Sequence, residues 1–220
     1  MSELTLVVGN KNYSSWSMRA WLFLRIAGIR FREIRIPLDQ PETSQAIARY
    51  SPSGRVPVLL DGELRVWESI AICEHAAERH GREGWPADPA ARAMARAVAH
   101  EMHAGFQALR NEFPMNIRAR RRLAASAAAD ADWHRIGRIW VDCRQQFGQH
   151  GPGLCGPLGI VDAMYAPVVM RARTYGVELP PLAAAWAQAI VDHPAVVEWI
   201  AAARQETEVV EADEAGEEIH

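Results

Sequence analysis

Two adjacent hydroxyl side chains, Ser14 and Ser15, lie between an apolar segment and a helical pattern, and Tyr13 precedes them. A hydroxyl at a helix start is not a strong nucleophile without a base, but it can donate a hydrogen bond to a thiolate. A donor and a helix dipole together favour the anion of a thiol, whose ordinary pKa is about 8.5. These residues therefore predict a site that activates a bound thiol. The alternative is that Ser14 only caps the helix.

A second informative stretch centres on a proline at the start of a predicted strand. Pro57 has no N–H for a strand ladder, so it fits only a strand's first residue or its edge, and the Val56–Pro57 bond is a candidate cis bond. The dipeptide Asp61-Gly62 predicts a hairpin turn. Ser69 predicts a helix start, whose free N–H groups and positive dipole end suit a carboxylate. This stretch could hold a peptide-like ligand by its backbone and by a carboxylate.

The elements that would position these groups follow a βαβ, α, ββα order. In chain order they are a strand at 4–8, a helix at 20–27, a strand at 31–36, a helix at 44–50, a hairpin at 58–67 and a helix from 69 to about 80. The crossover helix after the first strand implies a parallel pair of strands, and the hairpin adds antiparallel ones. The order matches an α/β thioredoxin-like N-terminal domain over residues 1–83.

The composition changes after this domain. Residues 84–89 form a linker, and Ala-rich helical patterns then predict an all-α helical C-terminal domain over residues 90–205. Its predicted helices span residues 90–122, 130–149, 161–175, 181–192 and 194–204. The arginine-rich segment 118–122 is interpreted as a helix end that complements its dipole. The acidic tail, residues 206–220, is expected to be mobile at its end.

Two motifs resemble cytosolic glutathione transferases. The run Arg55-Val56-Pro57-Val58-Leu59, the hairpin and Glu68-Ser69-Ile70-Ala71-Ile72 look like that family's glutathione-binding segment. There a cis-proline follows the residue whose backbone pairs with the cysteinyl part of glutathione, and the acidic-Ser pair holds the γ-glutamyl part. The run Ser14-Ser15-Trp16-Ser17-Met18-Arg19 is similar to the SSCSxR segment of the zeta class, which includes maleylacetoacetate isomerases. The resemblance covers nearly the whole chain and implies the glutathione transferase architecture.

The resemblance implies a set of site residues. The catalytic candidate is Ser14, with Ser15 as the near alternative and Tyr13 as second choice. Glutathione is the implied co-substrate, with binding residues Gln40, Arg55, Val56, Pro57, Glu68 and Ser69. The expected pocket for a second substrate involves Trp16, His103, Gln107, Arg110 and Met115. Trp16 departs from the class, which has Cys there, and this weakens the case for isomerase specificity. Arg19 is interpreted as a packing or pairing residue.

The segment Gly159-Ile160-Val161-Asp162 resembles the family's Ser/Thr-x-x-Asp capping box in the helical domain. The chain keeps the Asp and replaces the Ser/Thr with Gly. Asp162 can still accept a hydrogen bond from the Gly159 N–H, although the bond from the cap's own side chain is lost. We therefore assign Asp162 to folding.

The implied function is attack of a glutathione thiolate on a small electrophile held between the two domains. One alternative is cis–trans isomerisation of the maleylacetoacetate isomerase type, which keeps the glutathione residues and changes the second pocket. Another is a non-catalytic binding module with a transferase-like fold. A homodimer is expected from the resemblance alone.

Composition limits the remaining classes of function. The chain has 220 residues, 49% hydrophobic and 23% charged, which is ordinary for a soluble protein. A net charge of −3 argues against nucleic acid, because phosphate binding needs a concentrated basic surface. Three scattered cysteines and no recognisable signal segment predict a cytoplasmic protein without a metal site. No apolar run approaches the roughly 20 residues of a membrane-spanning helix.

Overall fold

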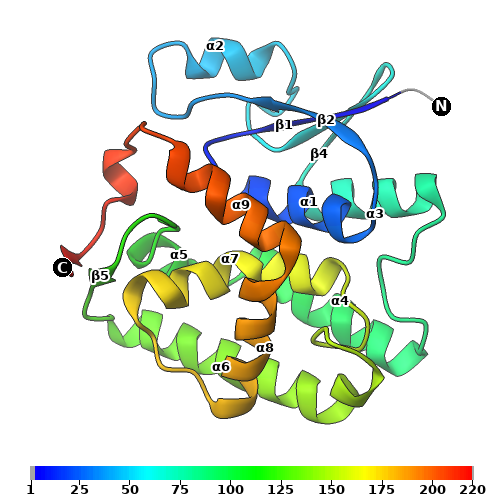
Figure 1. Ribbon diagram of the computed structural model, residues 1–220, viewed down its shortest axis with the longest axis vertical. Helices are drawn as coiled ribbons and strands as arrows, with labels where there is room; N and C mark the ends of the chain where they lie inside the picture. Colours follow the sequence, from blue (N-terminus) through cyan, green and yellow to red (C-terminus); the bar gives the residue numbers. More distant parts are fainter. Residues whose placement is uncertain (1–2, 220) are drawn as a thin grey trace.

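The computed structural model describes residues 3–219, so the expectations for residues 1–2 and 220 lie outside the described residues. The first half has the predicted βαβαββα order (Figure 1). Its elements are β1 (Leu4–Val8), α1 (Ser15–Ile26), β2 (Phe31–Arg35), α2 (Thr43–Ala48), β3 (Val58–Asp61), β4 (Leu64–Trp67) and α3 (Ser69–His80). Helix α1 begins before the predicted position because Ser14 acts as its N-cap.

The four strands form one mixed sheet in the order β2-β1-β3-β4. Strand β1 pairs parallel with β2 and antiparallel with β3, which in turn pairs antiparallel with β4. Alternate residues of a strand point to opposite faces. Leu4 and Leu6 accordingly belong to the main core, whereas Val7 packs with Ile47 of α2 on the other face. The sheet therefore separates α2 from the rest of the protein.

The second half is helical and packs on the first through α1 and α3. Its elements are α4 (Pro89–Ala104), α5 (Gln107–Glu112), β5 (Arg121–Arg122), α6 (Ala127–Phe147), α7 (Ile160–Tyr175), α8 (Pro181–Asp192) and α9 (Pro194–Gln205), followed by β6 (Glu217–Glu218) in the tail. Apart from the two-residue strand β5 and an isolated antiparallel bridge between Gly153 and Gly156, the described residues 89–205 form helices and loops. The predicted architecture, a thioredoxin-like domain followed by a helical domain, is confirmed.

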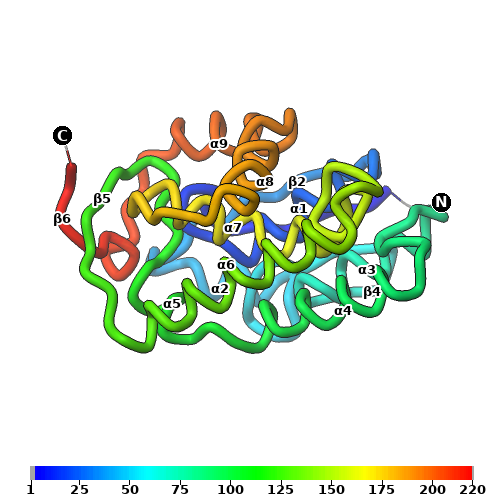
Figure 2. The backbone as a smooth tube through the Cα atoms, turned by 90° about the horizontal axis from the view of Figure 1, so that it is seen from below, coloured from blue at the N-terminus to red at the C-terminus, as the bar shows by residue number. Residues whose placement is uncertain are grey.

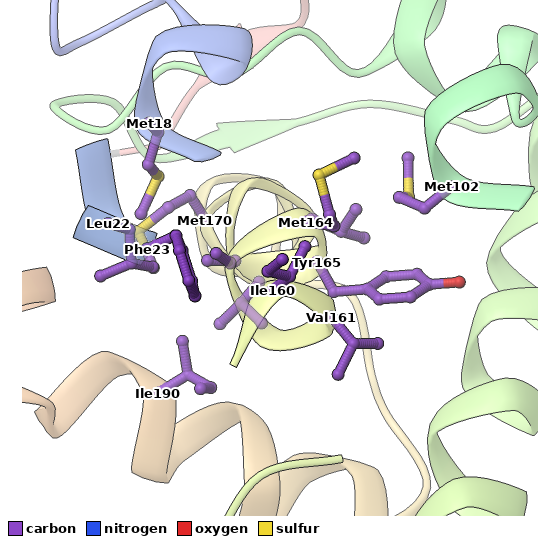
Figure 3. Packing of buried hydrophobic residues seen from close by; sticks show 14 of the residues in the cluster. Met18, Leu22, Phe23, Met102, Ile160, Val161, Met164, Tyr165, Met170 and Ile190 are labelled. Carbon is purple, nitrogen blue, oxygen red and sulfur yellow. The ribbon is translucent and has the colours of Figure 1, made fainter. Parts of the chain in front are cut away.

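Helix α7 lies at the centre of the main core. Each of its residues except Arg173 is buried. Figure 3 shows Met18, Leu22 and Phe23 packed on one side of this helix, with Met102 and Ile190 on other sides. These five residues come from α1, α4 and α8, so α7 joins the two halves of the chain through one continuous core.

The single helix predicted over residues 90–122 is wrong. Helix α4 ends at Ala104, and Phe106 has a φ of 60°, which breaks the helical path before the short α5. The side chain of Arg110 then covers the open end of α4: its Nε donates to the Gly105 carbonyl at 2.9 Å and its Nη2 to the His103 carbonyl at 3.1 Å. Carbonyls at a helix end have no intrahelical partner, so this arginine satisfies them.

The arginine-rich segment 118–122 does not end a helix, contrary to the prediction. It binds the acidic tail instead. Strand β5 pairs antiparallel with β6, so that Arg121 lies opposite Glu218 (Figure 2). Arg118 donates to the backbone carbonyls of Glu206 and Glu208. The opposite charges of two segments about ninety residues apart in sequence explain this pairing.

A close backbone contact explains why glycine, rather than serine or threonine, is the N-cap residue of α7 at position 159. Asp162 Oδ2 accepts the Gly159 N–H at 2.9 Å, as predicted, and Asp162 also accepts N–H groups of Leu154 and Trp186. A Cβ on Gly159 would lie 2.7 Å from the Gly84 carbonyl oxygen of the linker. A Ser or Thr side chain therefore does not fit here without moving backbone.

We expect Gly159→Ser to destabilise the protein by about 1–3 kcal/mol, even though serine is the better N-cap, because the added atoms overpack a fixed backbone contact. Urea unfolding followed by circular dichroism measures the change in the free energy of unfolding. The matched control is Gly137→Ala inside α6, where the nearest atom is 3.5 Å from the added Cβ. That variant should gain roughly 0.5–1 kcal/mol. A stabilised Gly159→Ser protein would contradict the steric explanation.

Candidate functional site

A cavity of about 130 Å³ lies at the junction of the sheet with α1 and α3. Five of the predicted glutathione-binding residues line it: Arg55, Val56, Pro57, Glu68 and Ser69. Trp16, at the start of α1, forms another wall, and Ser53 completes the lining. Three segments that are separate in sequence therefore meet at one cavity. Ser53 was not predicted as a site residue, although it stands two residues before Arg55 in the same turn.

Two backbone features shape this cavity. The Val56–Pro57 peptide bond is cis, as the sequence analysis expected. Glu68 has a φ of 68° and precedes the first residue of α3, Ser69, which is buried. The first N–H groups of a helix have no intrahelical partner and carry the positive end of its dipole. The cavity thus contains a helix start that can bind a carboxylate.

Gln40 does not reach this cavity. Its side-chain amide donates to the Asp39 carbonyl at 3.0 Å and its side chain is exposed. The structure gives Gln40 no contact with the cavity lining.

The three hydroxyl candidates have different hydrogen bonds. Ser14 Oγ donates to Ser17 Oγ at 2.7 Å and caps the first turn of α1. Ser15 Oγ accepts a hydrogen bond from Arg171 Nη2 at 3.3 Å, so its own proton stays available. The Tyr13 hydroxyl donates to Glu214 at 2.6 Å, and burial raises its pKa. The Tyr13 hydroxyl is therefore already used in a hydrogen bond with the C-terminal tail. Ser14 and Ser15, which precede Trp16 in the chain, remain the candidate donors to a thiolate.

The loop before Ser14 is held by the C-terminal tail. Both carboxylate oxygens of Glu206 accept backbone N–H groups, from Lys11 at 2.7 Å and from Asn12 at 3.0 Å. Glu214 accepts from Asn116 as well as from Tyr13. Mobility of the tail stays a prediction, but its described residues make specific contacts. Sequence analysis did not predict that the tail holds this loop, because in the sequence the tail is distinguished only by its acidic composition.

The predicted second-substrate residues fall into two groups. Trp16 lines the cavity, His103 contacts its ring edge at a centroid distance of 5.3 Å, and the Arg110 guanidinium lies 4.7 Å from the ring centroid. In contrast, Met115 is 1% exposed in the main core, and Gln107 is exposed with its amide on the Ala104 carbonyl. The structure brings the first three residues together and leaves the last two away from the cavity.

His103 also connects the two halves of the protein at the cavity. Its Nε2 lies 3.3 Å from Glu68 Oε2. Burial lowers the pKa of His103, the charge of Arg19 lowers it further, and Glu68 partly opposes them. Arg110 also contributes to the lowering.

Arg19 is completely buried, and its guanidinium lies 4.3 Å from the Trp16 ring centroid. Arg171 of α7 is also buried and contacts Ser15. The sequence around Arg19 and Arg171 has an ordinary helical pattern. It therefore does not show that these two arginines are buried rather than exposed at the surface. Sequence analysis assigned Arg19 to packing and did not single out Arg171.

The described residues contain a larger cavity of about 810 Å³ between α6 and the α7–α8 connection, lined by Trp133, His134, Arg138 and Tyr175 among others. None of the predicted site residues lines it. Residues 3–219 contain no group of three or more His, Cys, Asp or Glu side chains that could hold a metal ion, and none of their helices has the length and hydropathy of a membrane span.

Part of the chain matches a known protein family. The family model for the glutathione S-transferase N-terminal domain matches residues 13–79, which include Ser14, Val56–Pro57 and Glu68–Ser69. The N-terminal part of the chain therefore matches the N-terminal domain of the glutathione S-transferase family. Among curated relatives, dichloromethane dehalogenase of Methylorubrum extorquens is 39% identical over 51 residues, which is 23% of this chain and 18% of that protein. This match and a second dehalogenase match span about a fifth of those relatives' length.

Other relatives match over most of their length. The probable maleylacetoacetate isomerase of Vibrio cholerae is 27% identical over 180 residues, covering 76% of this chain and 80% of that protein. A glutathione transferase homologue from Burkholderia, solved with bound glutathione, superposes with a TM-score of 0.71 at 22% identity, covering 93% of this chain and all of the other. The theta class transferase of Xanthomonas axonopodis, also with glutathione bound, gives a TM-score of 0.67 at 22% identity, covering 91% and 98%. These structures confirm the fold.

We expect Arg110→Gln to raise the pKa of His103 toward its ordinary value, because removing a nearby cation makes the protonated ring less unfavourable. NMR titration of the histidine ring protons measures this pKa. The control variant Arg138→Gln removes an exposed arginine on α6 and should leave the pKa of His103 unchanged. An unchanged or lower pKa in Arg110→Gln would show that Arg110 does not act on this ring.

Proposed function

We propose that this protein is a glutathione-dependent transferase, in which a glutathione thiolate attacks a small electrophile beside Trp16. The observation that carries the proposal is the meeting of three segments at one cavity: the cis Val56–Pro57 pair, the α3 start at Glu68 and Ser69, and the first turn of α1. Each segment has the residue types that bind one part of a tripeptide thiol.

The binding mode follows from the charges of the ligand. The γ-glutamyl carboxylate fits the start of α3, where N–H groups lack partners and the dipole is positive. The γ-glutamyl ammonium fits the Glu68 carboxylate, whose side chain is 49% exposed and therefore accessible. Arg55 lines the same cavity and suits the glycyl carboxylate. The backbone of Val56 is then left for the cysteinyl part.

Ser14 remains our proposed thiolate donor, with Ser15 as its rival. The Ser14 hydroxyl would have to turn from Ser17 Oγ toward the sulfur, at the loss of one internal hydrogen bond. Ser15 needs no such exchange, because it accepts from Arg171 and its proton is free. Either hydroxyl stabilises charge on the sulfur, while binding beside Trp16 supplies proximity to the electrophile.

Isomerisation of the maleylacetoacetate isomerase type is the second candidate. It is favoured by relatives of that name whose match covers 76% of this chain, 24% identical in Caenorhabditis elegans and 27% in Vibrio cholerae. The thiolate would add to a cis double bond, the resulting single bond would rotate, and elimination of the thiolate would give the trans product. The glutathione residues are the same in both candidates.

We also propose that the protein is a cytoplasmic homodimer. Edge strand β4 exposes two large apolar side chains, Leu64 at 51% and Trp67 at 45%. An exposed apolar pair on a sheet edge is a typical place for contact with a second copy.

We expect Ser14→Ala to bind glutathione and to raise the pKa of its thiol by about one unit or more relative to the wild-type complex, because a donor to the thiolate is lost. Ultraviolet absorbance of the bound thiolate against pH measures this pKa. Ser15→Ala, measured in parallel, should leave the thiol pKa close to the wild-type value. The reverse result would assign the donor role to Ser15, and no pKa change in either variant would reject the serine mechanism.

We expect Glu68→Gln to weaken glutathione binding about 10- to 100-fold, since a charge-assisted hydrogen bond to the ligand's ammonium is lost. Isothermal titration calorimetry measures the affinity. Glu63→Gln, at the exposed β3–β4 turn, is the matched control and should bind like the wild type. If the wild type binds glutathione without turning over any electrophile, the non-catalytic binding module replaces the transferase.

A further inference from the structure

Three arginines from three different elements gather beside the cavity. Arg19 of α1 and Arg110 of α5 both lie against Trp16, with guanidinium-to-centroid distances of 4.3 Å and 4.7 Å. Arg171 of α7 donates to Ser15, the residue before Trp16. The cavity wall and the candidate hydroxyls therefore lie next to a cationic cluster, defined here as Arg19, Arg110 and Arg171.

No carboxylate of the described residues forms an ion pair with this cluster. Among the ion pairs of the described residues, none includes Arg19, Arg110 or Arg171, although Arg19 is 0% and Arg171 5% exposed. Arg19 Nε and Nη1 and Arg171 Nη1 are buried without a hydrogen-bond partner. Buried charges are normally paired, because their desolvation is otherwise uncompensated.

The acidic groups around the cluster act on it without forming an ion pair with any of its guanidinium groups. Asp132 faces Arg110 but accepts the Leu109 N–H at 3.0 Å. Asp213 faces Arg171, and burial raises the pKa of Asp213 to about 6. The carboxylate of Glu68 is half exposed and contacts His103 rather than an arginine of the cluster.

The neutral groups around the cluster do not add negative charge. Burial raises the pKa values of the thiol of Cys73, the phenol of Tyr165 and the phenol of Tyr175, so all three are uncharged near pH 7. Burial and the neighbouring arginines lower the pKa of Arg19 and of Arg171. Burial lowers the pKa of His103, which contacts both Trp16 and Glu68, and the charges of Arg19 and Arg110 lower it further.

We propose that the missing counter-charge of the cationic cluster is the thiolate of bound glutathione, so that these arginines activate the thiol together with a serine hydroxyl. The S–H bond breaks, the proton leaves to solvent, and the sulfur keeps the electron pair in the field of the cluster. Charges buried in a low-dielectric interior act over several ångströms, so direct contact with the sulfur is not required. The inference rests on the proposed glutathione site.

Arg171 has an additional positioning role in this scheme. Its Nη2 donates to the Oγ of Ser15, the alternative thiolate donor, so this role applies only where Ser15 replaces Ser14 as the donor. Its Nε is held by the Phe113 carbonyl at 2.7 Å, so the guanidinium cannot turn freely. Arg19 has no hydrogen-bond partner at Nε or Nη1. In this scheme it stabilises the thiolate only through the electrostatic field of its positive charge.

The experiment measures the pKa of the glutathione thiol in complexes of wild type, Arg19→Met and Arg171→Gln by ultraviolet titration. Each replacement removes one buried cation, so we expect each to raise the thiol pKa by about one unit. Because the charges are buried, the shift should change little between low and moderate salt. Arg173→Gln, an exposed neighbour on α7, is the matched control and should leave the thiol pKa unchanged.

Folding is monitored separately. Methionine fills a similar volume without charge, and Arg19 lacks partners to lose at Nε and Nη1, so Arg19→Met should melt at the wild-type temperature or above. A purely structural arginine would lower the melting temperature and leave the thiol pKa alone. Arg110→Gln serves as a third variant with the same expected rise in thiol pKa, and because Arg110 also binds the carbonyls at the end of α4, its melting temperature is measured as well.

The outcomes separate the inference from the proposed function. If calorimetry detects no glutathione binding to the wild type, the proposed function fails. If the wild type binds with a lowered thiol pKa that none of the three variants changes, the function stands and the inference is wrong. A raised KM for anionic but not neutral electrophiles, with no change in thiol pKa, would assign the cluster to the second substrate and also overturn the inference.

Discussion

The burial of α7 is the constraint on which the rest of the structure depends. Helix α7 contacts α1 and α3 of the first half and α4 and α8 of the second, so the two halves share one core (Figure 3). Polar groups on such a helix must find partners away from water. Asp162 accepts three N–H groups, and Thr174 donates to the Asn116 carbonyl at 2.7 Å. Arg171 is the polar residue of this helix that keeps an unpartnered nitrogen.

The position of the Ser14 loop depends on chain segments far away in sequence. Glu206 binds the Lys11 and Asn12 N–H groups, and Trp199 Nε1 donates to the Lys11 carbonyl at 3.0 Å. The Asn12 side chain bonds Asn116 at 2.9 Å. The thioredoxin-like half therefore does not define its own candidate site. The helical half and the tail hold the loop from which the hydroxyls project.

The cavity also illustrates why functional sites reduce stability. The cations Arg19 and Arg110 beside Trp16 and Arg171 beside Ser15 are unfavourable to each other and to the surrounding apolar core, and none of them forms an ion pair with a carboxylate of the described residues. Packing of α1 and α7 keeps these groups in place. A site that is preorganised for an anion must carry this cost before the anion arrives.

The sequence by itself determined the features that depend on local chemistry. Pro57 lacks a backbone N–H and can adopt a cis bond, and Gly62 permits the positive φ of a tight turn, so the cis bond and the hairpin could be predicted from single residues. Tertiary structure decided the rest. The helix break at Phe106, the tail's pairing with β5 and the cationic cluster all arise from packing and charge between segments distant in sequence. Such contacts depend on the relative positions of whole helices, which residue spacing along one segment does not contain.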